Sequence, residues 1–153
     1  MGKSVAIEVQ GDLDTLRIVW SVVEAVLGEI PEARFKEEER YYTMVAVQEI
    51  LTNIFRHGYD YDFDKPVRIE LDVEDSVLEV TLIDQGPPFD PTGYDPPQDQ
   101  DVLTKEGGYG IAIVAAVMDR TEYMRTENTN ILVLTKDFGQ PAPVPGAGGG
   151  GGQ

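Results

Sequence analysis

The chain has 153 residues, the length of one domain, and twelve Lys and Arg against 28 Asp and Glu give a formal charge of −16. This charge excludes binding driven by attraction to nucleic-acid phosphates or to an anionic membrane. The absence of cysteine excludes disulfides and thiolate metal sites. One histidine and three serines leave little material for a Ser-His-Asp triad, so any catalysis should rest on carboxylates. Because we find no signal-peptide core and no membrane-spanning run, we expect a cytoplasmic protein.

The composition changes sharply at Gln140, where prolines alternate with small residues and lead into a run of glycines. Such a segment has too little apolar surface to pack, so residues 140–153 are predicted to be a disordered Pro/Gly-rich tail. Residues 3–139 are expected to form the folded domain.

The first half of that domain reads as a strand followed by two helices. Alternation of Val5, Ile7 and Val9 with polar residues predicts a half-buried strand. Apolar residues then recur at three- and four-residue steps over residues 12–28, which predicts an amphipathic helix. A second helix is predicted over residues 37–57, with a glycine directly after it.

The second half is dominated by strands. Alternating apolar residues predict a hairpin of residues 67–73 and 78–82. A proline-rich and acidic segment, 84–108, is too long for an ordinary connection and indicates a functional loop or lid. A short helix over 111–119 and a last strand pair, 121–127 with 130–136, complete the domain. This order predicts a two-layer α/β sandwich with helices on one face of a mixed sheet.

The second helix carries the first candidate site. Glu49 and Asn53 lie four residues apart, so they project from one face of the helix. The ordinary explanation is a solvated polar stripe. The functional one requires the amide oxygen of Asn53 to bind a hard cation such as Mg²⁺, which leaves Glu49 free for proton transfer.

Two further segments could bind a ligand. Asp84 ends a predicted strand, where its carboxylate could accept from an exocyclic amine such as that of adenine, and Gly86 would let the backbone approach the ligand. An ordinary turn explains the same residues. The glycines around Gly108 and Gly110 open into a helix whose free N–H groups favour an anion, although a flexible hinge is the simpler alternative.

Taken in chain order, the three segments resemble a known family. A helical E-x-x-x-N, a strand ending in D-x-G and a G-G-x-G entering a helix resemble the N, G1 and G2 boxes of the GHKL superfamily of ATP-binding proteins. The sequences EILTNIFRHGY at 49–59, DQGPPFDP at 84–91 and EGGYGI at 106–111 look like those of bacterial anti-sigma-factor serine kinases, the RsbW and SpoIIAB type. The similarity covers about residues 5–138.

This resemblance implies a Bergerat-type (histidine kinase-like) sandwich that binds ATP and Mg²⁺. Asn53 would match the metal ligand, Glu49 the base that takes the proton of a substrate serine, and Asp84 the residue that binds adenine. The other positions expected to contact the nucleotide are Gly86, Lys105, Gly108, Tyr109, Gly110 and Ile111.

The resemblance also implies partners. Such proteins dimerise, bind a sigma factor and phosphorylate a small STAS-domain anti-anti-sigma protein, and Arg17 falls near their partner-contacting arginine. One departure is the segment from Asp84 to Glu106, which has six acids and one base, so its charge opposes a bound triphosphate.

We therefore expect an ATP-dependent serine protein kinase that regulates by partner switching. An inactive ATP-binding module, or one that sequesters a partner without nucleotide, is the first alternative, and an ATP-hydrolysing conformational switch is the second. A histidine kinase is poorly supported, because His57 lies within the predicted nucleotide-site helix.

Overall fold

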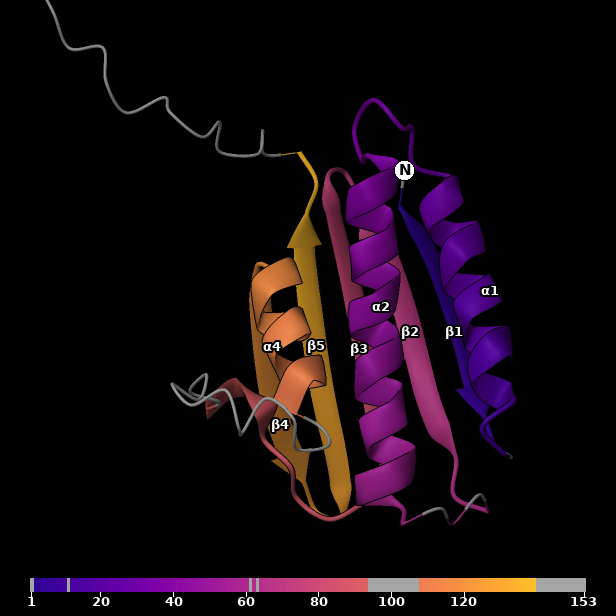
Figure 1. Cartoon of the computed structure of the whole chain (residues 1–153), viewed down its shortest axis with the longest axis vertical. Coiled ribbons are helices and arrows are strands. Elements are labelled where there is room, and N and C mark those ends of the chain that lie inside the picture. The colour runs from indigo at the N-terminus through magenta and orange to yellow at the C-terminus, as the bar shows by residue number, and fades with distance from the viewer. Residues whose placement is uncertain (1, 11, 61, 63, 94–107, 140–153) are drawn as a thin grey trace, which may run out of the picture.

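The computed structural model describes residues 2–10, 12–60, 62, 64–93 and 108–139. They form two layers, a five-stranded sheet with three helices on one face (Figure 1). The predicted two-layer sandwich is therefore confirmed. The predicted tail, 140–153, and most of the predicted lid lie outside the described residues. The strands are β1 (Lys3–Val9), β2 (Val67–Glu74), β3 (Val77–Asp84), β4 (Arg120–Thr126) and β5 (Thr129–Asp137).

The sheet has the order β1-β2-β3-β5-β4, and all four described strand pairs are antiparallel. The prediction of a mixed sheet was therefore wrong. A crossover through a helix normally returns to a parallel strand, and β3 and β4 do point the same way. They are not neighbours, because β5 turns back from β4 and inserts between them.

The helices are α1 (Thr15–Gly28), α2 (Glu37–Asn53) and α4 (Gly108–Val117). The helix predicted to continue to residue 57 changes after Asn53 into a π-helical turn, Ile54–Gly58. Such wide turns are rare and often occur at functional sites. This one places the residues after Asn53 at the end of the molecule where β3 terminates.

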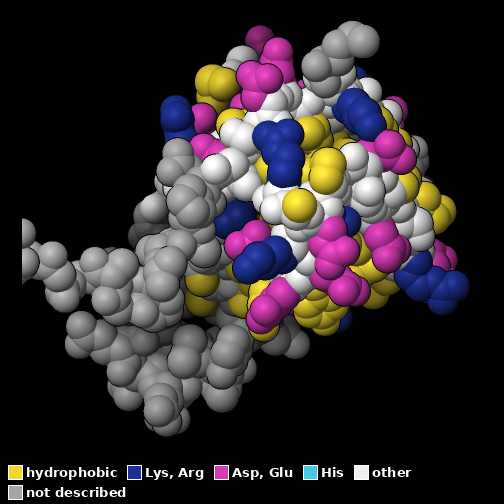
Figure 2. Space-filling model, turned by 90° about the horizontal axis from the view of Figure 1, so that it is seen from above, with side chains coloured by type: hydrophobic (Ala, Val, Ile, Leu, Met, Phe, Trp, Pro, Cys, Tyr) yellow, Lys and Arg dark blue, Asp and Glu magenta, His cyan; other side chains and the backbone are white. Residues whose placement is uncertain are grey.

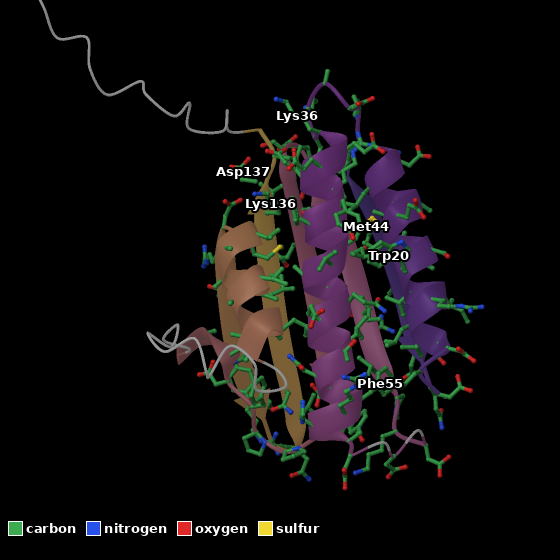
Figure 3. All side chains as sticks on the ribbon, in the orientation of Figure 1. Trp20, Lys36, Met44, Phe55, Lys136 and Asp137 are labelled. Atoms are coloured by element: carbon green, nitrogen blue, oxygen red, sulfur yellow. The ribbon has the colours of Figure 1, made fainter. Side chains whose placement is uncertain are left out.

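The core lies between the helices and the sheet. Alternate residues of β2 and β3 point toward the helices and are almost fully buried, as the strand periodicity predicts. Trp20 of α1 and Met44 of α2 point into the junction of these two helices, and Phe55 is buried near the end of α2 (Figure 3). This packing holds the C-terminal end of α2 against the sheet beside the end of β3.

Candidate nucleotide-binding site

A cavity of about 360 Å³ opens at the end of the molecule where α2 and β3 terminate. Its size falls in the range of pockets that hold small molecules. Four regions contribute to it: the end of α2 with the π-helical turn, the segment after β3, the start of α4, and the β4–β5 hairpin. The lining residues are Ile50, Asn53, Ile54, His57, Gly58, Asp84, Pro87, Pro88, Phe89, Pro91, Ile111, Tyr123, Asn130 and Leu132.

Asp84 is the carboxylate of this cavity. It is the last residue of β3 and is only 8% exposed. Its Oδ1 accepts hydrogen bonds from the backbone N–H of Gly86 at 2.8 Å and from Nδ2 of Asn130 at 3.0 Å. Both described bonds to this carboxylate end on the same oxygen, so Oδ2 is the oxygen with acceptor capacity for a ligand.

Gly86 allows the chain to pass close to two groups of the protein. A Cβ at this position would lie 3.0 Å from Oδ1 of Asp84 and 3.3 Å from the carbonyl oxygen of Gly58. We predicted that the missing side chain would admit a ligand. The neighbours that the structure describes at this position are Asp84 and Gly58, so the glycine also joins the end of β3 to the π-helical turn, and the approach of a ligand stays a prediction.

Three side chains of the β4–β5 hairpin hold the segment after β3 in place. Asn130 of β5 donates through Nδ2 to the carbonyl oxygens of Gly86, at 3.1 Å, and Pro87, at 3.0 Å. Its Oδ1 accepts from the Tyr123 hydroxyl at 2.5 Å and from Nη1 of Arg125 at 2.8 Å. Arg125 also donates to the Gly86 carbonyl at 3.0 Å.

Tyr59 supports the same segment from the other side. Its hydroxyl donates to the Pro66 carbonyl at 2.7 Å and accepts from the backbone N–H of Gln85 at 2.8 Å. Burial raises the pKa of Tyr59. The hydrogen bond from the Gln85 N–H lowers it by less than burial raises it, and the negative charge of Asp84 adds the smallest contribution, a further increase. Tyr59 therefore stays neutral at physiological pH and keeps its proton for the bond to Pro66.

Asn53 lies at the end of α2, lines the cavity together with Asp84, and is 9% exposed. Its Nδ2 is buried and has no hydrogen-bond partner among the described residues. A buried amide with an unused polar atom normally has a ligand or water partner, and rotation by 180° exchanges its nitrogen and oxygen. The side chain therefore fits an Mg²⁺ ligand. No cluster of three or more acidic, His or Cys side chains suited to a metal occurs in the described part of the chain.

Glu49 is half-buried one turn before Asn53 on α2 and is not among the residues that line the cavity. Arg17 is exposed on α1 and is likewise absent from the lining. The structure thus places these two predicted residues outside the cavity wall.

The glycine-rich segment is described only in part. Gly108, Tyr109 and Gly110 form the first turn of α4, and Ile111 lines the cavity, so the start of this helix adjoins it. Lys105 lies outside the described residues. A helix start beside a cavity provides backbone N–H groups that favour an anion.

The family model of the histidine kinase-like ATPase domain matches residues 9–136. The chain belongs to this family.

Its curated relatives include RsbW serine-protein kinases. The one from Oceanobacillus iheyensis is 30% identical over 81 residues, which are 49% of this chain and 51% of that protein. The one from Halalkalibacterium halodurans is 32% identical over 102 residues, 60% of this chain and 59% of that protein. This chain thus spans little more than half the length of these two relatives.

A solved structure has the same fold. The crystal structure of the RsbU and RsbW domains of Rv1364c from Mycobacterium tuberculosis matches with a TM-score of 0.61 at 19% identity, covering 92% of this chain and 34% of that one. Together with the family model, this match identifies the sheet and helices as a GHKL-type sandwich, the fold that the motifs implied.

Membership of the histidine kinase-like ATPase family implies ATP binding. The cavity contains Asn53, Asp84 and Ile111 of the predicted nucleotide contacts. Sequence analysis missed the hairpin residues Tyr123 and Asn130. Asn130 did leave a signal, because a carboxamide at an inward position of a strand that otherwise buries leucines needs a buried partner. None of the helices that the structure describes has the length and apolarity to cross a bilayer.

Proposed function

We propose that this histidine kinase-like domain is an ATP-dependent serine protein kinase and partner-switching regulator. The observation that carries the proposal is the cavity itself. A buried carboxylate, that of Asp84, and a buried amide with an unused polar atom, that of Asn53, both line it beside the start of α4. The RsbW similarity supports phosphotransfer to serine as its chemistry.

Each end of the cavity would hold a different part of the nucleotide. Asp84 would accept from the adenine amino group through Oδ2, and the proline-rich segment with Phe89 would cover the apolar face of the base. Asn53 would hold Mg²⁺ through its amide oxygen, while the N–H groups at the start of α4 would face the phosphates. Bound Mg²⁺ would neutralise charge that develops on the transferred phosphoryl group.

Glu49 would act as the base. As the substrate serine oxygen forms a bond to the γ-phosphorus and the bond to the β-phosphate oxygen breaks, Glu49 would receive the hydroxyl proton, leaving ADP and a phosphoserine. Its position one turn before Asn53 keeps it outside the cavity wall.

The proposed partners follow from the RsbW similarity. They are a STAS-domain anti-anti-sigma protein as substrate and a sigma factor as the sequestered protein, with a cytoplasmic homodimer as the acting form. Arg17, which is exposed on α1, would contact the partner. The net charge of −16 gives no basis for direct binding of nucleic acid.

Calorimetric titration with ATP, with and without Mg²⁺, tests the first step. We expect Mg²⁺-dependent micromolar affinity, about −8 kcal/mol.

An assay of phosphotransfer to STAS-domain proteins tests the second step, the transfer of phosphate. Glu49→Gln should keep ATP affinity and lose about 100-fold or more in transfer rate. Near-normal transfer by this variant would overturn the role of Glu49.

One observation favours a second candidate, a module that binds ATP or sequesters a partner without phosphotransfer. Glu49 does not line the cavity, and the described residues place no other acid beside Asn53 in its wall except Asp84. ATP binding without transfer to any STAS-domain protein, together with tight binding of a sigma factor, would support this candidate.

A further inference from the structure

Asn130 occupies a special place in the sheet. It is paired with Asp84 in the register of β3 and β5, so both side chains point to the helix-covered face at the cavity. Asn130 is 4% exposed, and both of its polar atoms are engaged by protein groups. It is therefore not a direct ligand of the nucleotide but a link between the hairpin and Asp84.

Only one orientation of the Asn130 amide satisfies its surroundings. Tyr123 and Arg125 donate toward one atom, while the Asp84 carboxylate and the carbonyls of Gly86 and Pro87 accept at the other. A flipped amide would set NH₂ against the Arg125 donor and oxygen against three acceptors. The network itself thus determines the orientation, with Nδ2 toward Asp84.

We propose that Asn130 is the positioning residue for the base-binding end of the cavity: by holding Oδ1 of Asp84 it directs Oδ2 toward the amino group of an adenine nucleotide. This inference rests on the proposed function only for the identity of the base. A carboxylate that could rotate freely would offer either oxygen in many directions, and ordering it would then cost free energy on binding.

The charges at the two ends of the link strengthen it. Arg125 is a cation that donates to Oδ1 of Asn130, and Asp84 is an anion that accepts from Nδ2 of the same amide. Hydrogen bonds in such a chain polarise one another, and bonds to charged groups are the stronger ones. The same chain anchors the segment after β3, because the Tyr123 hydroxyl also accepts from the Phe89 N–H at 3.3 Å.

Asn130→Asp tests the role with almost no change in shape. The new carboxylate can still accept from Tyr123 and Arg125, but it opposes Asp84 and two carbonyls. In the parent the two side chains lie 3.0 Å apart, and two carboxylates this close share a proton. As the pH falls, the new carboxyl group therefore takes up a proton and can again donate to Asp84. We expect ADP affinity to fall about 10-fold or more at pH 8 and to recover to within about threefold of the parent at pH 6.

Asn128→Asp is the matched control, because it makes the same chemical change two residues away at an exposed turn position. It should leave ADP affinity unchanged at both pH values. The other ionisable groups near the pair are Tyr123 and Arg125 of β4, which bond to Asn130, Tyr59, which bonds to Gln85, and His57, which lines the same cavity. These groups are the same in the parent, in Asn130→Asp and in the control. The ratio of variant to parent affinity at each pH therefore reports only the effect of the new carboxylate pair.

A second measurement needs no nucleotide. Hydrogen exchange of the Gly86 amide, which donates to Asp84 Oδ1, reports the fixed carboxylate directly. Beyond the intrinsic dependence of exchange on pH, Asn130→Asp should lower the protection of this amide about 10-fold at pH 8 and restore it at pH 6, while Asn128→Asp should not.

The two measurements separate the possible failures. If the parent binds no ATP or ADP but the exchange result holds, the proposed function fails and the positioning role of Asn130 stands. If Asn130→Asp shows parent-like Gly86 protection at both pH values, or binds ADP like the parent at pH 8, the positioning role is overturned. A pH-independent loss of affinity that accompanies lowered thermal stability would also overturn it, because that indicates a structural role only.

Discussion

At the end of the molecule where β3 begins, charged side chains lie on the surface and bind one another, whereas at the end where β3 terminates, polar side chains are buried and surround a cavity. The surface end is the one seen in Figure 2, where basic and acidic side chains are interspersed with hydrophobic ones. Lys3 and Glu29 form an ion pair there at 3.0 Å, and the Arg34 guanidinium donates to the Asp75 carbonyl and lies 5.5 Å from the centre of the Phe138 ring. A small cavity of about 140 Å³ lies among these groups.

The two ends of the molecule differ in the hydrogen-bond and ion-pair partners of their polar groups. At the surface end Lys3 is paired with Glu29 and the Arg34 guanidinium with a backbone carbonyl, and these groups are exposed, so little is left for a ligand to satisfy. At the other end Asn53 has an unused buried nitrogen, and the described bonds to Asp84 leave Oδ2 with acceptor capacity. Burial without complete pairing marks the binding end, because such groups are costly until a ligand completes them.

Asn53→Ala should give the largest effect on binding. The substitution removes the one amide that we assign to Mg²⁺, so Mg²⁺-dependent ATP affinity should fall about 100-fold or more, within the range for hydrogen bonds to charged groups. Calorimetry with and without Mg²⁺ measures it. An unchanged affinity would remove the metal role, and the comparison of the two ends would then depend on Asp84 alone.

Asp84→Asn should give the next largest effect. An asparagine can still accept from Gly86 N–H and Asn130 through its oxygen, but it then presents NH₂ to the base in place of a carboxylate oxygen. We expect about a 10- to 100-fold loss of ATP affinity. Inosine triphosphate carries an oxygen in place of the amino group, so the parent should prefer ATP over it. If Asp84 recognises the amino group, Asp84→Asn should reduce this preference. Equal binding of ATP by parent and variant would therefore contradict the site.

Tyr59→Phe should affect stability more than chemistry. It removes the donor to Pro66 and the acceptor of Gln85 N–H, a cost of about 1–3 kcal/mol in the free energy of unfolding. Because burial raises the pKa of Tyr59 above its ordinary value of 10, this tyrosine stabilises the fold fully below pH 10. As the pH rises above 10, the unfolded chain loses the proton first, and this stabilisation declines. Urea titrations at neutral and alkaline pH should show a smaller alkaline loss in Tyr59→Phe than in the parent.

Arg34→Ala should give the smallest effect, and it serves as the control from the other end of the sheet. The exposed hydrogen bond to Asp75 and the contact with Phe138 are together worth about 1 kcal/mol or less. Thermal unfolding should detect a small loss, while ATP affinity stays that of the parent. A change in affinity would show that the two ends are coupled, which would break the comparison.

The element order of this domain could be predicted from the sequence because it depends on local pattern. The alternation of apolar residues over 67–73 and the helical spacing over 12–28 identify strand and helix within a few residues of their observed bounds. The family resemblance rested on the same kind of information, short motifs in a particular order. Asn53, Asp84 and Ile111 were found in this way, and all three line the cavity.

The partners of these residues could not be predicted, because they come from distant parts of the chain. Asp84 and Asn130 are 46 positions apart and meet only because β5 pairs with β3, and the sequence led us to expect a mixed sheet. The π-helical turn after Asn53 was likewise read as continuous helix, since its difference is one of backbone winding and not of apolar spacing.

The sequence by itself therefore determined which segments are helices and strands, which motifs they carry, and which family the chain resembles. Only the tertiary structure decided that β5 inserts between β3 and β4, that Asn130 holds one oxygen of Asp84, and that Glu49 lies outside the cavity wall. Local periodicity is a property of neighbouring residues. The orientation of a buried carboxylate depends on hydrogen bonds between strands that are brought together only when the sheet forms.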